Sequence, residues 1–289
     1  MKNPKFSIII ATYNMADCIV DTIESILCQE FKDYEILIYN DASKDNTIQV
    51  IEGIKDERIK LIDNEINIGL GGARNRAVKM AKGEYILFLD ADDTLYGSTT
   101  LTQINEVISK SNPDVAYFGV QYKGGSNKQY LPNAENSTKK ARILCDMQFA
   151  VSSKCWRRQF LEEKNITFVE DIYYEDMVYS IKATILAEKI DFGEFPIYNY
   201  TRNRDGSITS TPNLKRCIDM YKMLAYVTEL YDITPEEYRP YLLSFIKQET
   251  MNIPYKVGEI LKAHKQGTNN PVFEKRQYKF DEKDKDVNI

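Results

Sequence analysis

Residues 85–96 read YILFLDADDTLY, a stretch in which an apolar run ends in a cluster of acids. Five apolar or aromatic residues lead directly into three acids, Asp90, Asp92 and Asp93. A continuous apolar run predicts a strand buried on both faces of a sheet. Two like charges about 4 Å apart repel by roughly 4 kcal/mol at an effective dielectric of about 20. The acids therefore either point apart into water or hold a cation.

Strands and helices alternate on both sides of this stretch. Further buried strands are predicted at 6–14 (FSIIIATYN), 34–41 (YEILIYND), 58–63 (RIKLID) and 114–122 (DVAYFGVQY), and helical patterns occupy most of the segments between them. This alternation predicts an α/β fold with a mostly parallel sheet flanked by helices.

Polar clusters follow three of the predicted strands. They are ATYN at 11–14, NDAS at 40–43 and DADD at 90–93. In such sheets ligands bind beyond the carboxyl ends of the strands. Three clusters at this edge favour the cation interpretation of the acids over a solvated loop.

The last part of the chain is predicted to be helical. Residues 175–189 (EDMVYSIKATILAEK) have helical periodicity, and beyond residue 213 we expect only helices. A stripe that includes Leu214, Ile218, Tyr221 and Leu224 is predicted to face the core. Residues 213–264 are expected to form a helical C-terminal region, and 265–289 a charged, flexible tail.

Composition excludes several classes of protein. The chain has 289 residues, 43% of them hydrophobic, and a formal net charge of -5. An acidic chain argues against nucleic acid as a partner. The five cysteines form no CxxC pair, which indicates neither a zinc site nor a disulfide framework. No run approaches the roughly 20 apolar residues of a membrane-spanning helix. We therefore expect a cytoplasmic protein without a transmembrane segment.

Two motifs of other enzyme families also occur in part: one lacks a residue and the other lies at an unusual place in the chain. GLGG at 69–72 resembles part of a dinucleotide-binding loop, but Arg74 stands where the third glycine belongs. DADDT also fits the DxDxT pattern of haloacid-dehalogenase-like phosphatases. In those enzymes the motif normally closes the first strand of the core, whereas three strands precede it here.

The ordered set SIIIATYN, YNDASKDNT, NIGLGGARNRA, FLDADD and YYEDM resembles the inverting family 2 glycosyltransferases with the GT-A fold. SKCWRRQFLEEKNITF and PIYNYTRNRDGSITS are similar to segments of the bacterial capsule and cell-wall enzymes of that family. The resemblance implies a GT-A domain over 1–212, with a donor half at about 1–123 and an acceptor half at about 124–212. The helical region then forms a C-terminal extension.

The resemblance implies a nucleotide-sugar donor and assigns residues to it. Thr12, Tyr13 and Asp41 would hold the base and ribose, Arg74 the base or a phosphate, and Asp90 the ribose or a group beside the metal. Three of these residues have a structural alternative: Tyr13 as a packed aromatic, Asp41 as a helix cap and Arg74 in a surface salt bridge.

Further residues are assigned by the same resemblance. Arg202 or Arg204 and Ser207 would reach the diphosphate, with an exposed basic loop as the alternative. Trp156 would line the acceptor side, with a core tryptophan as the alternative.

The acids match the metal-binding DxD motif of the family. Carboxylates suit Mg²⁺ or Mn²⁺, which bind through one or two side chains plus phosphate oxygens. We expect Asp92 and Asp93 to hold the metal. The general base is assigned to Asp176, with Glu175 in support; the alternative for this pair is a helix start that favours acids.

The sequence thus predicts a metal-dependent inverting hexosyltransferase that moves a sugar from a UDP-sugar to a glycan hydroxyl in bacterial surface polysaccharide synthesis. The acceptor is a carbohydrate and could be lipid-linked. Peripheral membrane association and homo-oligomer formation through the C-terminal helices are both open. The alternatives are a non-catalytic sugar-nucleotide-binding subunit and a nucleotidyltransferase, which would need a Gly- and Lys-rich loop that IIIATYN lacks.

Overall fold

The computed structural model describes residues 3–123, 128–132, 149–201 and 214–266. The chain divides into two compact units. The first is drawn from 1–134, 150–171 and 187–202, and the second from 135–149, 172–186 and 203–289. The segment that leads to Asp176 thus groups with the C-terminal helices, whereas the sequence places it with the sheet. Each unit is described by itself below.

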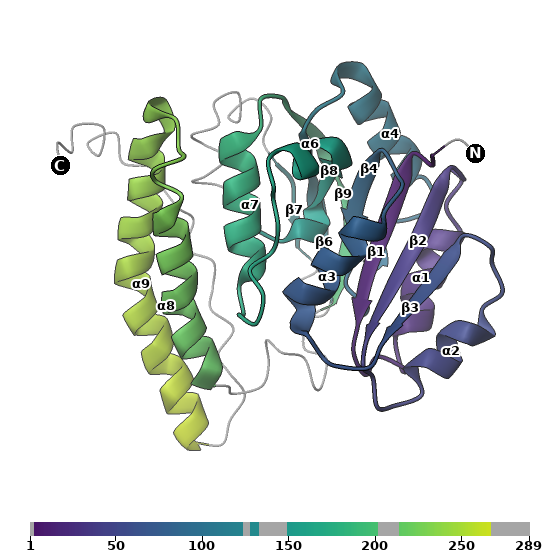
Figure 1. Ribbon diagram of the computed structural model, residues 1–289, viewed down its shortest axis with the longest axis horizontal. Helices are drawn as coiled ribbons and strands as arrows, with labels where there is room; N and C mark the ends of the chain where they lie inside the picture. Colours follow the sequence, from purple (N-terminus) through teal and green to yellow (C-terminus); the bar gives the residue numbers. More distant parts are fainter. Residues whose placement is uncertain (1–2, 124–127, 133–148, 202–213, 267–289) are drawn as a thin grey trace. The chain divides into compact units, whose positions relative to one another are not determined.

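The first unit begins with parallel strands separated by helices, as predicted (Figure 1). In the sheet these strands follow the order β3-β2-β1-β4. Figure 1 shows α3 in front of them and α1 behind. The strands are Phe6–Thr12 (β1), Tyr34–Asp41 (β2), Ile59–Asn64 (β3) and Tyr85–Phe88 (β4), and the helices are Ile19–Leu27 (α1), Thr47–Gly53 (α2) and Gly69–Met80 (α3).

The second half of the sheet is mixed. β8 lies antiparallel between β4 and β6, while β6 and β9 run parallel to each other. The elements are Thr94–Leu95 (β5), Thr100–Ser111 (α4), Val115–Lys123 (β6), Gln129–Tyr130 (β7), Val151–Ser153 (η1), Lys154–Arg157 (β8), Arg158–Glu163 (α6) and Ile190–Thr201 (β9). The sequence analysis did not assign β8 or β9.

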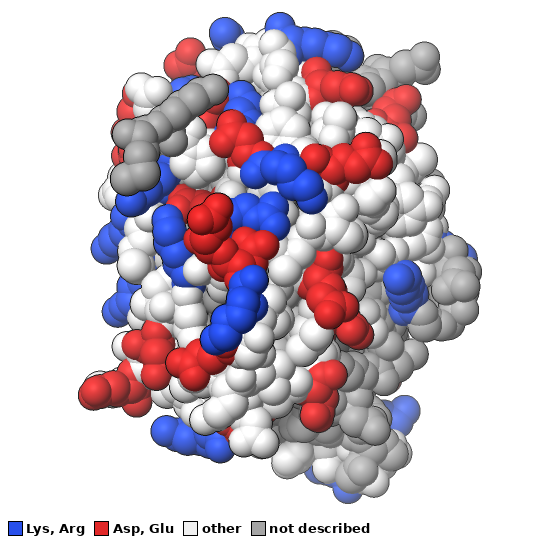
Figure 2. All heavy atoms as spheres, turned by 90° about the vertical axis from the view of Figure 1, so that its right-hand side faces the viewer, with Lys and Arg blue, Asp and Glu red and all other residues white. Residues whose placement is uncertain are grey.

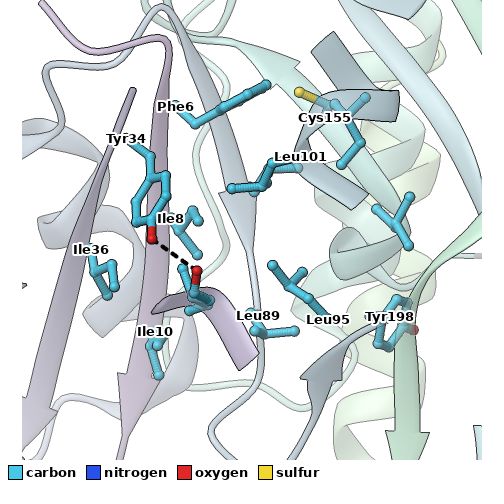
Figure 3. Packing of buried hydrophobic residues seen from close by; sticks show 14 of the residues in the cluster. Phe6, Ile8, Ile10, Tyr34, Ile36, Leu89, Leu95, Leu101, Cys155 and Tyr198 are labelled. Atoms are coloured by element: carbon cyan, nitrogen blue, oxygen red, sulfur yellow. Dashed lines mark hydrogen bonds between the residues drawn. The ribbon is translucent and has the colours of Figure 1, made fainter. Parts of the chain in front are cut away.

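A hydrophobic core lies between the sheet and the helices α1 and α4. Ile8 lies beside Ile36 on one strand and Leu87 on the other, and all three are buried. Figure 3 shows part of this cluster. Its one dashed line joins the Tyr34 hydroxyl to the carbonyl oxygen of Ile26, at 2.9 Å. The long apolar runs of the sequence thus become strands buried on both faces.

The second unit is helical. Figure 1 shows α8 and α9 running side by side. Its elements are Glu175–Leu186 (α7), Leu214–Glu229 (α8), Glu236–Tyr238 (η2) and Arg239–Gln266 (α9). The predicted helix at 175–189 and the predicted helical region are therefore confirmed. None of the helices in the described ranges combines the length and the hydropathy that crossing a bilayer requires.

The predicted core stripe of α8 is wrong. Leu214, Ile218 and Tyr221 are exposed, by 43%, 60% and 50%. The buried face instead carries Met220, Met223 and Val227 together with the charged side chains Arg216 and Asp219. A helix whose buried face contains charges cannot be oriented from its apolar residues alone.

The surface shown in Figure 2 carries charges of both signs, with Lys and Arg interspersed among Asp and Glu. Ion pairs among the described residues include Arg58 with Asp56 at 2.6 Å and Lys5 with Glu84 at 2.9 Å. Opposite charges at such distances offset one another, so this face has a mixed local field.

Candidate functional site

The loops after β1 and β2 are joined by side-chain hydrogen bonds to backbone. The Lys44 N–H donates to the Asn14 side-chain oxygen at 2.7 Å, and the Asn14 N–H donates to Ser43 Oγ at 2.9 Å. The Met15 N–H donates to Thr47 Oγ1 at 2.8 Å. These bonds fix the ATYN and NDAS loops against each other at the carboxyl end of the strands. The edge where a ligand is expected is therefore preorganised.

Asp41 holds the start of α3. Its two carboxylate oxygens accept from the N–H groups of Ile68 and Gly69, at 2.8 and 2.9 Å. The side chain is buried, and Gly69 has a φ of 78°, which favours glycine. Asp41 is thus a cap, as its structural alternative proposed, but for α3 and not for its own turn. A direct contact of Asp41 with a nucleotide stays a prediction.

Thr12 and Tyr13 end β1 in different environments. Thr12 is 2% exposed, and among the described residues its hydroxyl has no hydrogen-bond partner. A buried hydroxyl without a partner costs free energy and calls for a ligand or water. Tyr13 is 43% exposed, so it is not a packed core aromatic. Tyr13 is therefore accessible to a ligand, whereas the Thr12 hydroxyl is enclosed by protein.

Arg74 and Asp90 form a pair at the end of β4. Arg74 Nη2 donates to Asp90 Oδ1 at 2.6 Å, and the arginine is 4% exposed. Its guanidinium also lies 5.9 Å from the ring centre of Phe88 and 5.3 Å from that of Phe168. Arg74 thus forms a salt bridge, as its structural alternative has it, but its own side chain is buried while that of Asp90 is 38% exposed. A buried cation beside two aromatic rings that pack against each other is a fixed positive charge at this edge.

Phe168 and Asn75 belong to this arrangement although the sequence analysis did not single them out. The Phe168 N–H donates to the Asn75 side-chain oxygen at 2.8 Å, and the Asn75 amide donates back to the Phe168 carbonyl at 2.9 Å. Asn75 follows Arg74 in α3, so the same helix supplies the arginine and the residue that holds its aromatic neighbour. Only the fold reveals this contact, because 93 positions separate the two residues.

The neighbouring acids Asp92 and Asp93 face different surroundings. Asp93 is 1% exposed and its Oδ1 accepts from the Thr201 N–H at 2.9 Å, which ties the DADD turn to the end of β9. Burial raises the pKa of Tyr198 well above its ordinary value, and the charges of Asp93 and Asp90 add to this effect. Asp92 is only partly buried. The structure thus gives Asp93 a structural contact and leaves Asp92 nearer to solvent.

The described residues contain no group of three or more His, Cys, Asp or Glu side chains arranged to hold a metal. The acids that could donate to a metal at the end of β4 are Asp90, which pairs with Arg74, and the partly exposed Asp92. A hard divalent cation that takes one or two carboxylates and completes its shell with phosphate oxygens and water fits this set.

Trp156 is a core residue. It is 0% exposed and lies in β8 between Ile86 and Val115, with its Nε1–H donating to the Val151 carbonyl at 3.3 Å. The side chain has no surface to offer an acceptor, so the structure agrees with the core alternative. Its neighbour Lys154 is also fully buried, and its Nζ donates to the Ala150 carbonyl at 2.8 Å.

Glu175 and Asp176 lie in the second unit, at the start of α7. Glu175 is buried and Asp176 is partly buried. The positive end of the helix dipole stabilises both carboxylates. Arg202, Arg204 and Ser207, the predicted diphosphate contacts, lie outside the described residues.

Comparison with known proteins defines the class. The model of glycosyl transferase family 2 matches residues 7–166, which include ATYN, NDAS, Arg74 and DADD. The chain therefore belongs to glycosyl transferase family 2.

Individual relatives are bacterial glycosyltransferases. The chain is 33% identical to the poly(ribitol-phosphate) beta-glucosyltransferase of Bacillus spizizenii, over 70% of this chain and 33% of the relative. It is 29% identical to the uncharacterized glycosyltransferase EpsJ of Bacillus subtilis, over 72% of this chain and 64% of EpsJ. The aligned region thus spans about a third of the first relative and just under two thirds of the second.

Solved structures agree on the fold. The crystal structure of residues 1–349 of Staphylococcus aureus TarS matches with a TM-score of 0.68 and 24% identity, over 86% of this chain and 72% of that one. The same TarS fragment in complex with UDP-GlcNAc matches with a TM-score of 0.64 and 20% identity, over 91% of this chain and 92% of that one. The predicted GT-A fold, a mixed α/β sheet with flanking helices, is therefore confirmed.

Proposed function

We propose that this protein is a metal-dependent, inverting glycosyltransferase that moves a sugar from a UDP-sugar to a glycan hydroxyl in the synthesis of a bacterial surface polysaccharide. The observation that carries the proposal is the pair of buried Arg74 with Asp90, 2.6 Å apart, at the strand end that also bears Asp92. A fixed cation next to carboxylates suits a ligand that brings both phosphates and a metal ion.

The donor would lie across the carboxyl ends of β1, β2 and β4. Exposed Tyr13 is available to the nucleoside, and Thr12 next to it has a buried hydroxyl without a partner among the described residues. The hydrogen-bonded loops around Asn14 limit how far this edge can adjust. Asp41 would act mainly by holding the start of α3, where it accepts from the N–H groups of Ile68 and Gly69.

Asp92 is the proposed ligand of Mn²⁺ or Mg²⁺, with Asp90 between the cation and Arg74. Asp93 is the weaker candidate, because one of its oxygens already accepts from the Thr201 N–H. When bound, the ion would neutralise negative charge that develops on the departing diphosphate.

Asp176 is the proposed general base. Its carboxylate would take the proton of the acceptor hydroxyl as that oxygen forms a bond to the anomeric carbon. The bond from this carbon to the diphosphate breaks on the opposite side, so an α-linked donor would give a β linkage. Glu175, buried beside it, would orient the acceptor or the base.

The named relatives support the substrate classes. One is named a poly(ribitol-phosphate) beta-glucosyltransferase, and a solved neighbour is described in complex with UDP-GlcNAc. UDP-glucose and UDP-N-acetylglucosamine are therefore the first donors to test, and a polyol or glycan hydroxyl is the proposed acceptor.

The test combines donor binding with turnover. A panel of sugar nucleotides is screened by thermal shift with and without Mn²⁺, and release of UDP is then measured with any donor that binds. Asp176→Asn should keep the donor-induced shift and lose roughly 10²- to 10⁴-fold in UDP release. Asp232→Asn, the same change at an exposed position of the second unit, is the control.

Three results would contradict the proposal. If no sugar nucleotide binds, the donor site is wrong. If donors bind but Asp176→Asn releases UDP as fast as the wild type, Asp176 is not the base. If donors bind and the wild type releases no UDP, the chain fits a sugar-nucleotide-binding subunit better.

A further inference from the structure

Helix α8 carries two buried charged residues on its inward face. Arg216 is 7% exposed and Asp219 is 0% exposed, three positions apart on one side of the helix. Lys215 Nζ lies 2.7 Å and Lys222 Nζ 3.5 Å from the Asp219 carboxylate. A buried carboxylate is costly unless it is paired and hydrogen-bonded. These contacts pair the Asp219 charge, although its Oδ1 accepts no hydrogen bond among the described residues, at a position where an apolar side chain would pack more simply.

Both buried charges contact the two tyrosines that precede α7. The Tyr173 N–H donates to Asp219 Oδ2 at 3.0 Å, and Lys215 Nζ lies 5.1 Å from the centre of the Tyr173 ring. Arg216 Nε donates to the Tyr174 hydroxyl at 3.1 Å, with its guanidinium 5.8 Å from the centre of that ring. One tyrosine is held by its backbone and the next by its side chain.

The held residues set the direction in which α7 begins. Tyr174 has a φ of 69°, a left-handed conformation that a bulky side chain adopts only when its surroundings impose it. Its carbonyl then accepts from the Met177 N–H at 3.2 Å in the first turn of the helix. Glu175 and Asp176 lie within that turn. Fixing Tyr173 and Tyr174 therefore fixes where the Asp176 carboxylate points.

We propose that Asp219 and Arg216 are positioning residues for the general base. They hold Tyr173 and Tyr174, and in this way they orient Asp176 to take the proton of the acceptor hydroxyl. The inference rests on the proposed function, in which Asp176 takes the acceptor proton. It gives α8 a catalytic purpose in addition to packing. A base displaced by about 1 Å can lose on the order of 100-fold in rate while substrate still binds.

The kinetic test uses UDP release from UDP-glucose or UDP-N-acetylglucosamine with Mn²⁺. Asp219→Ala removes the acceptor of the Tyr173 N–H, and we expect kcat to fall roughly 10- to 100-fold while the KM for donor stays within about twofold. Asp219→Asn keeps a side-chain oxygen that can accept from the Tyr173 N–H and should recover most of the lost kcat.

A matched variant separates positioning from simple loss of packing. Val227→Ala cuts back a fully buried residue on the same helix, away from the two tyrosines. It should lower the unfolding temperature without lowering kcat. If Asp219→Ala fails to fold, Arg216→Met takes its place, because it keeps an apolar chain of similar length and removes the hydrogen bond to Tyr174.

Amide hydrogen exchange gives a readout that needs no substrate. Faster exchange over residues 172–177 in Asp219→Ala, but not in Val227→Ala, is expected. Normal kcat in both Asp219→Ala and Arg216→Met, or an equal kcat loss in Val227→Ala, overturns the inference while the proposed function stands. A wild-type protein that releases UDP from no donor overturns the proposed function, and this inference with it.

Discussion

The two ends of the neighbouring strands β1 and β2 treat buried polar groups in opposite ways. At the amino end, the Glu35 carboxylate accepts from Ser7 Oγ at 2.6 Å, from the Lys82 N–H at 2.7 Å and from Lys60 Nζ at 2.5 Å. Ser7 Oγ in turn accepts from the Gly83 N–H at 2.8 Å. Burial acts to raise the pKa of Glu35, but these hydrogen bonds outweigh it and hold the pKa below its ordinary value.

At the carboxyl end, buried groups are left with unused capacity. Among the described residues, Thr12 Oγ1 and Asn40 Oδ1 are buried without a hydrogen-bond partner. Asp92 is partly exposed beside the Arg74–Asp90 pair. A satisfied polar network stabilises a fold, whereas unsatisfied groups in a preorganised edge indicate a ligand.

The presence of a cavity does not by itself show which end of the strands binds a ligand. One of about 480 Å³ lies at the amino end, where its lining includes Lys5, Glu84 and Arg158. Those charges are already paired, Lys5 with Glu84 at 2.9 Å and Arg158 with Glu162 at 2.6 Å. The difference between the ends is therefore one of hydrogen-bonding state: substitutions at the amino end should cost stability, and those at the carboxyl end should cost activity.

The largest effect is expected for Asp92→Asn. The amide keeps the shape of the side chain and removes the charge of the proposed metal ligand, so UDP release should fall by at least about 100-fold and the Mn²⁺-dependent part of the donor thermal shift should disappear. The unfolding temperature of the protein alone should stay close to that of the wild type. Asp17→Asn, an exposed acid after β1, is the control. Full activity in Asp92→Asn would place the metal elsewhere.

Glu35→Ala should show the opposite pattern. It leaves Ser7 and the Lys82 N–H without their acceptor, and we expect a loss of roughly 2–3 kcal/mol in the free energy of unfolding. Denaturant titration measures this loss. Activity per folded molecule should be unchanged, because Glu35 is at the end of β2 remote from DADD. A large fall in kcat with intact stability would remove the contrast between the two ends.

Thr12→Val gives a smaller and more specific effect. Removing a buried hydroxyl that has no partner should leave stability unchanged or raise it by up to about 1 kcal/mol, while donor affinity falls roughly two- to tenfold through loss of one hydrogen bond. Thr22→Val is the contrast, because the Thr22 hydroxyl lies 2.9 and 2.8 Å from the Ala91 and Asp93 carbonyl oxygens. That variant should be destabilised. Equal losses of stability in both variants would show that Thr12 has a structural partner.

The smallest effect concerns pH. Because the folded pKa of Glu35 lies below its ordinary value, its contribution to stability is present above the unfolded pKa and is lost as pH falls through the folded pKa. The wild type should therefore lose more stability than Glu35→Gln between neutral pH and pH values below the ordinary range of a glutamate. Urea titrations across that window measure the difference, and parallel curves for the two proteins would contradict it.

Much of the fold followed from the sequence. Phe6–Thr12 and Tyr34–Asp41 were predictable because continuous apolar runs suit strands buried on both faces. Lys154–Arg157 was not predicted, because four residues carry no periodicity, and its place between β4 and β6 comes from pairing with distant strands. The buried face of α8 was misjudged because Arg216 and Asp219 turn inward to meet tyrosines more than 40 positions away.

The candidate site, like the fold, could be predicted only in part from the sequence. The sequence by itself determined that acids follow the strand at 85–88, in an order of motifs that defines the family. Only the tertiary structure decided which acids are used internally: Asp93 accepts from the N–H of Thr201 and Asp41 from that of Gly69, while Asp92 stays partly exposed. Spacing along a strand cannot give this result, because a carboxylate turns inward only where the fold brings a distant backbone donor to meet it.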